Sequence, residues 1–122
     1  MILCLAGVTP ARAARGADMD DNAALALAAI RAAAGTGARV LLASSAAVYG
    51  NQGGLLTESS QLEPVSPYGR AKAGMERQGA RLAAELGVRV SSLRIGNIAG
   101  LDAILGGWRP GFQLDRFPDG RT

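Results

Sequence analysis

The clearest structural signal in this chain is the stretch VLLASS at residues 40–45, in which four apolar residues are followed by two serines. A short apolar run of this kind is typical of a buried strand in a parallel sheet. A similar run lies at residues 2–6, and a third strand is predicted at 88–93. Segments with helical spacing of apolar residues lie at 23–34 and 67–86. The order strand, helix, strand, long loop, helix, strand predicts an α/β protein with a parallel sheet and helices on both of its faces.

The candidate functional residues lie where the predicted strands end. Ligands of open parallel sheets bind beyond the carboxyl ends of the strands. The residues found at those ends, or at the start of the helix reached from the same side, are Ala6, Gly7, Ser44, Ser45, Tyr68 and Asn97. We therefore expect them to lie at one edge of the sheet.

Tyr68 and Lys72 form the most specific pair in the sequence. Lys72 is the one lysine among 13 basic residues, and it follows Tyr68 by four positions. On a helix this spacing places the two side chains one turn apart. A compact ammonium close to a phenol favours the phenolate and lowers the pKa of the phenol. Tyr68 is therefore a candidate acid/base near neutral pH, although an ordinary contact on a helix surface would produce the same spacing.

The composition excludes several kinds of chemistry for this chain. It has 122 residues, no histidine and one cysteine, Cys4. Ser-His-Asp or Cys-His catalysis, an internal disulfide and a cysteine-rich zinc site are therefore excluded. The net charge of +3 is spread along the sequence, which argues against a nucleic-acid partner. No apolar run approaches the ~20 residues that span a bilayer, and we expect a cytoplasmic protein without a metal or a membrane partner.

Four blocks of the sequence occur together in one known family. They are VLLASSAAVYG at residues 40–50, TE at 57–58, PYGRAKAGME at 67–76 and LRIGN at 93–97. In these blocks the chain resembles the extended short-chain dehydrogenase/reductases, the group of NAD-dependent nucleotide-sugar epimerases and dehydratases. The resemblance implies a partial Rossmann-like sheet equivalent to strands 4, 5 and 6 of the doubly wound fold. Residues 1–100 would be the C-terminal half of the dinucleotide-binding domain, and residues 101–122 the start of a substrate-binding lobe.

The resemblance also implies roles for individual residues. Tyr68 would be the general acid/base for a substrate hydroxyl while hydride passes to or from the nicotinamide of NAD or NADP. Lys72 would lower the pKa of Tyr68 and hold the nicotinamide ribose, and Ser45 would hydrogen-bond the same substrate oxygen. The residues implied on the cofactor side are Ala6, Gly7, Asn22, Ser44, Tyr68 and Lys72. Asn97 and Ser45 would lie on the side of a nucleotide-sugar substrate.

Several of these residues have structural explanations that the sequence leaves open. Ser44 and Ser45 would also serve to end a strand, and Asn22 would also serve as a helix cap. Asn97 is compatible with a turn, since asparagine tolerates left-handed backbone. Arg94 is equally compatible with an internal ion pair and with a ligand contact.

One feature of the family is missing from this sequence. Its members begin with a strand and a glycine-rich turn that binds the pyrophosphate, and no such turn follows a strand here. We therefore expect the chain to be the central part of a longer protein and to bind cofactor weakly by itself. The alternative is an inactive relic or an interaction module that binds no cofactor. Full-length members usually dimerise through the helix that would carry Tyr68, and the sequence leaves open whether this chain does.

Overall fold

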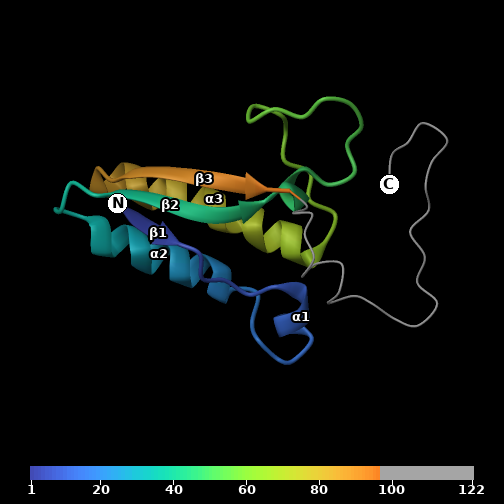
Figure 1. Cartoon of the computed structure of the whole chain (residues 1–122), viewed down its shortest axis with the longest axis horizontal. Coiled ribbons are helices and arrows are strands. Elements are labelled where there is room, and N and C mark those ends of the chain that lie inside the picture. Colours follow the sequence, from blue (N-terminus) through green and yellow to red (C-terminus); the bar gives the residue numbers. More distant parts are fainter. Residues whose placement is uncertain (97–122) are drawn as a thin grey trace, which may run out of the picture.

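The computed structural model describes residues 1–96 of the chain, and the predicted lobe at 101–122 and Asn97 lie outside the described residues. Figure 1 shows one sheet lying against two long helices. The elements are β1 (Ile2–Cys4), α1 (Pro10–Ala13), α2 (Asp21–Ala33), β2 (Arg39–Ser45), the 3₁₀ helix η1 (Ala46–Tyr49), α3 (Pro67–Leu86) and β3 (Arg89–Ile95). All strands are parallel, in the order β1-β2-β3, which confirms the predicted α/β sheet.

The central strand β2 pairs with a neighbour on each side. Leu3 of β1 lies opposite Leu41, and Ile95 of β3 lies opposite Ser45. The strand predicted at residues 2–6 ends at Cys4, because the chain then leaves the sheet toward Val8. The carboxyl ends of all three strands lie at one edge, where the candidate residues were expected.

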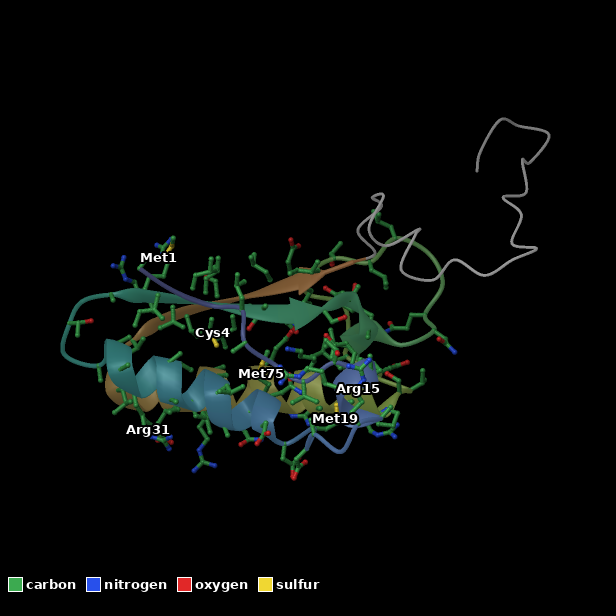
Figure 2. All side chains as sticks on the ribbon, turned by 60° about the horizontal axis from the view of Figure 1, so that its bottom comes forward. Met1, Cys4, Arg15, Met19, Arg31 and Met75 are labelled. Atoms are coloured by element: carbon green, nitrogen blue, oxygen red, sulfur yellow. The ribbon has the colours of Figure 1, made fainter. Side chains whose placement is uncertain are left out.

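The hydrophobic core lies between the sheet and the two long helices, which cover the same face (Figure 2). Leu42 of β2 and Ile30 of α2 are fully buried there. A Cβ at Gly79 would lie 3.3 Å from a methyl group of each of them, so the glycine lets α3 approach closely. The opposite face carries exposed Leu3 and Leu93. We expected helices on both faces of the sheet. Within residues 1–96, both long helices cover the same face.

The start of α3 is fixed by its cap and by a close approach to η1. Ser66 caps the helix by accepting a hydrogen bond from the Gly69 amide at 2.9 Å, and Pro67 occupies the first helical position. A Cβ at Gly69 would collide with the carbonyl oxygen of Ala47 in η1. Because η1 directly follows Ser45, this contact brings the first turn of α3, which carries Tyr68, onto the end of β2.

The sequence interpretation missed α1, a single turn that begins after Thr9. Thr9 caps it by accepting a hydrogen bond from the Arg12 amide at 3.4 Å. The signal was the Thr-Pro pair at residues 9–10, which marks a helix start. Within residues 1–96, no helix has the length and hydropathy needed to cross a membrane.

Candidate functional site

A cavity of about 250 Å³ lies at the carboxyl ends of the strands. Its lining includes the predicted residues Gly7, Ser44, Ser45, Tyr68 and Lys72. These residues come from β2, from the first turns of α3 and from the segment after β1. The structure therefore brings most of the predicted site together around one space. Ala6 is exposed and does not line this cavity, although it directly precedes Gly7.

Lys72 is buried at the inner wall of the cavity. Its side chain is 5% exposed, and Nζ donates a hydrogen bond to the carbonyl oxygen of Ala43 at 2.9 Å. Nζ also lies 5.8 Å from the centre of the Tyr68 ring. Burial away from water lowers the pKa of Lys72, while the nearby thiol of Cys4 acts in the opposite direction. An ammonium has three N–H donors, so the bond to Ala43 leaves donors for a ligand in the cavity.

Gly7 lines the same cavity beside Lys72. A Cβ at this position would lie 2.7 Å from Oδ1 of Asn22 and 3.1 Å from Nζ of Lys72. A side chain would thus fill the space between the backbone and the ammonium. Glycine keeps this space open.

The side chain of Asn22 holds the segment after β1 in place by hydrogen bonds to its backbone. Its side chain is 1% exposed, Oδ1 accepts from the Val8 amide at 3.2 Å, and Nδ2 donates to the carbonyl oxygens of Val8 and Met19 at 3.1 and 3.0 Å. Both N–H donors of the carboxamide are therefore used on backbone groups. The arrangement gives Asn22 a structural task, and its contact with a cofactor stays a prediction.

Ser44 and Ser45 have different partners because successive strand residues face opposite sides of a sheet. The Ser44 hydroxyl donates to Oε1 of Glu76 on the helix-covered side. Ser45 Oγ accepts from the Ala47 amide at 3.2 Å, which caps η1 and leaves the hydroxyl hydrogen free to donate. Ser45 is thus placed to donate a hydrogen bond into the cavity, as its predicted role requires.

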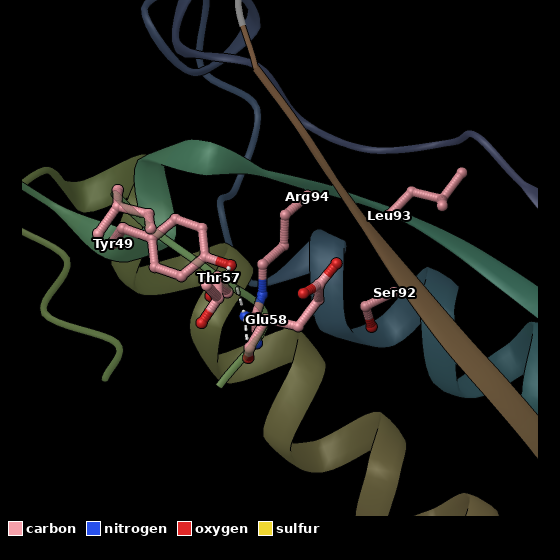
Figure 3. Close-up of a pocket in the computed structure, with 7 residues that line it drawn as sticks. Tyr49, Thr57, Glu58, Ser92, Leu93 and Arg94 are labelled. Atoms are coloured by element: carbon pink, nitrogen blue, oxygen red, sulfur yellow. Dashed lines mark hydrogen bonds between the residues drawn. The ribbon is translucent and has the colours of Figure 1, made fainter. Parts of the chain in front are cut away.

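Arg94 belongs to an internal ion pair. Its Nη2 lies 2.8 Å from Oε2 of Glu76, and the two side chains are 20% and 8% exposed. Its Nη1 donates to the Tyr49 hydroxyl at 2.8 Å and to the Glu58 carbonyl oxygen at 2.9 Å (Figure 3). The hydrogen bonds to Glu76 and Tyr49 raise the pKa of Arg94 above its usual value. Of the two explanations left open for Arg94, the structure favours the ion pair.

The fold and the edge cluster define a class of protein. A parallel sheet whose carboxyl edge gathers a serine, a tyrosine and a lysine four residues further on is the arrangement of the short-chain dehydrogenase/reductases. The sequence profile of the NAD dependent epimerase/dehydratase family matches residues 1–105. The chain belongs to this family, as the sequence blocks predicted.

Solved structures of two UDP-sugar 4-epimerases and of a protein in complex with UDP-glucose resemble the chain. UDP-glucose 4-epimerase from Brucella ovis in complex with NAD matches with a TM-score of 0.63 and 26% identity, over 75% of this chain and 30% of that chain. A UDP-galactose 4-epimerase matches with a TM-score of 0.60 and 30% identity, over 75% and 33%. MoeE5 in complex with UDP-glucose and NAD matches with a TM-score of 0.58 and 32% identity, over 75% and 31%. These neighbours confirm the Rossmann-like fold class.

The chain spans about a third of the length of these solved proteins. No curated protein sequence matches it.

Proposed function

We propose that this chain carries the catalytic residues of an NAD(P)-dependent enzyme that acts on a nucleotide sugar, by epimerisation, dehydration or reduction at a sugar hydroxyl or ketone. The observation that carries the proposal is the cavity of about 250 Å³ that Tyr68, Lys72 and Ser45 line together. Membership of the epimerase/dehydratase family and the UDP-sugar enzymes among the structural neighbours support it.

The residues at the cavity fit the nicotinamide end of a dinucleotide. Gly7 leaves its backbone open to a ligand beside the ammonium of Lys72, and that ammonium has N–H donors left for ribose hydroxyls. A bound nicotinamide would supply the hydride-transfer chemistry of the reaction. Residues 1–96 hold no glycine-rich turn for the pyrophosphate, so this chain supplies one part of the cofactor site. The choice between NAD and NADP stays open.

The protein groups would handle the proton that accompanies hydride transfer. Tyr68 would take a proton from a substrate hydroxyl and return it to the carbonyl oxygen in the reverse step. Ser45 would donate a hydrogen bond to the same oxygen and hold it against Tyr68. Lys72 stays in place through the Ala43 carbonyl oxygen.

Binding of NAD to the chain of 122 residues tests the cofactor part. Binding at an NAD concentration c stabilises the fold by RT ln(1 + c/Kd), which is about 0.4 kcal/mol when c equals the dissociation constant. Thermal denaturation with and without millimolar NAD measures this stabilisation. We expect Lys72→Met to reduce this stabilisation and Arg31→Met, which removes an exposed cation from α2, to preserve it. Equal stabilisation of both variants would contradict the role of Lys72.

Turnover tests the acid/base role of Tyr68. Tyr68→Phe removes the ionisable hydroxyl and keeps the ring, so it should preserve the NAD-dependent stabilisation. In a completed version of the chain, the rate at which Tyr68→Phe converts a UDP-sugar should be about 10²–10⁴-fold lower than the wild-type rate. Chromatography of the products measures this rate. Unchanged turnover in Tyr68→Phe would contradict the proposal.

A second candidate function is an interaction module that binds no cofactor. The open face of the sheet favours it, since Leu3, Leu5, Leu93 and Ile95 are exposed there or at its end. A chain that folds cooperatively, is unaffected by NAD and NADP and associates with itself in sedimentation experiments would support this alternative over the enzyme.

A further inference from the structure

A buried carboxylate lies where β2, β3 and α3 meet, outside the cavity described above. Glu76 is 8% exposed. Its Oε1 accepts a hydrogen bond from the Ser44 hydroxyl, and both of its oxygens accept from Nε of Arg94 at 3.2 Å. We refer to Ser44, Glu76 and Arg94 as the carboxylate clamp.

The clamp follows from the register of the strands. Ser44 and Arg94 are opposite each other in the pairing of β2 with β3. Side chains at paired positions lie on the same face, so both meet Glu76 on the side that α3 covers. One helical turn earlier, Lys72 donates to the carbonyl oxygen of Ala43. Two successive turns of α3 are thereby bonded to two successive residues of β2, directly before Ser45.

Arg94 extends the clamp to the segment that follows η1. Its guanidinium lies 5.0 Å from the centre of the Tyr49 ring and bonds the Tyr49 hydroxyl and the Glu58 carbonyl oxygen. The Tyr49 hydroxyl in turn donates to the carbonyl oxygen of Thr57 at 2.9 Å. The ion pair therefore holds a strand end, a helix and a loop in one arrangement.

The guanidinium of Arg94 is engaged inside the protein. A second cavity of about 350 Å³, which Figure 3 shows, lies against Arg94, Tyr49 and Glu58. Nε and Nη2 of Arg94 bond Glu76, and Nη1 bonds Tyr49 and Glu58. The side-chain nitrogens of Arg94 thus all bond to other groups of the protein, and the arginine acts as an internal cross-link.

We propose that Glu76 and Arg94 are positioning residues that set the register of α3 on β2 and so hold Tyr68 and Lys72 against Ser45. Neither residue lines the cavity in which those groups meet. Their effect passes through Ser44, whose hydroxyl is held by Glu76 and whose neighbour is Ser45. The effect of the clamp on turnover rests on the proposed function. Its effect on the order of the strand end at Ser45 does not depend on that function.

The strand end itself gives the first test, by hydrogen exchange of the Ala47 amide, whose acceptor is Ser45 Oγ. The variant is Glu76→Met combined with Arg94→Met, since replacing a buried ion pair by apolar side chains often preserves stability. We expect faster exchange at Ala47 and unchanged exchange at Val40 in the core. Glu76→Gln, which keeps the volume of the side chain, should show the same direction. Unchanged exchange at Ala47 in both variants would overturn the proposal.

Steady-state kinetics with NAD and a UDP-sugar, on a version of the chain completed with a glycine-rich turn and a substrate-binding lobe, give the second test. A displacement of about 1 Å at the reacting groups lowers rates by about 10²-fold. We expect kcat of the double variant to fall by about that factor with KM little changed. Arg81→Met combined with Glu85→Met removes an exposed ion pair from the same helix and should leave kcat unchanged. A double clamp variant with wild-type kcat would refute the positioning role. A completed version without turnover would refute the proposed function, and the exchange experiment would still decide the clamp.

Discussion

Replacing Asn22 by alanine should destabilise the fold by an amount that the structure allows us to work out. The substitution removes three hydrogen bonds, two to the backbone of Val8 and one to the carbonyl oxygen of Met19. Val8 is 5% exposed, so its amide and carbonyl oxygen would lose a partner while buried. A buried polar group left without a partner costs about 1–3 kcal/mol. We expect a total loss of about 2–4 kcal/mol from the free energy of unfolding.

Urea denaturation followed by circular dichroism measures this loss directly. Asn51→Ala is a matched control, because Asn51 is exposed and a substitution there should change stability by less than about 0.5 kcal/mol. For a domain of this size the loss from Asn22→Ala corresponds to a fall in Tm of about 10–25 °C. If Asn22→Ala and Asn51→Ala unfold at the same urea concentration, the role assigned to Asn22 is wrong.

Further predictions concern α3. Gly69→Ala should destabilise the protein because its Cβ would collide with the carbonyl oxygen of Ala47. Gly74→Ala should stabilise the helix by up to about 1 kcal/mol, because its Cβ would lie 3.9 Å from Nε2 of Gln78 and meet nothing closer. Thermal denaturation of the two variants checks the sign of each change. Burial lowers the pKa of Lys72 from 10.5 in the folded state. Between the two pKa values the unfolded chain therefore binds more protons, and stability rises with pH in that window. The stability difference between wild type and Lys72→Met should accordingly grow in favour of wild type as pH rises from neutral to 10.5, and a constant difference in urea midpoints would contradict this.

The strands and long helices could be predicted because their signals are local. The apolar run around Leu42 is strand-like by itself. The helix α3 has a cap at Ser66 and a left-handed glycine at Gly87, where φ is 65°. The end of β1 could not be predicted in the same way. It depends on the bonds between Val8 and Asn22, which are 14 residues apart in the sequence.

The candidate site was predictable for the residues that the motif places at strand ends. Tyr68, Lys72 and Ser45 meet at one cavity as expected. The carboxylate clamp was not assembled from the sequence, although Glu76 belongs to one of the family-like blocks. Its partners lie 18 and 32 residues away, and only the register of β2 with β3 shows that Ser44 and Arg94 face the same carboxylate.

The different tasks of Ser44 and Ser45 follow from the alternation of a strand. Side chains at neighbouring positions face opposite sides of the sheet, so the hydroxyl of Ser44 meets the helix and that of Ser45 does not. Ser44 bonds the helix carboxylate that also binds Arg94, whereas Ser45 keeps its hydroxyl hydrogen available. Ser44 thus takes part in the bonds that fix α3 on β2, and its neighbour Ser45 is the group that would contact a substrate. A displacement of α3 along β2 would therefore move Tyr68 relative to Ser45, which is why an ion pair outside the cavity bears on the chemistry within it.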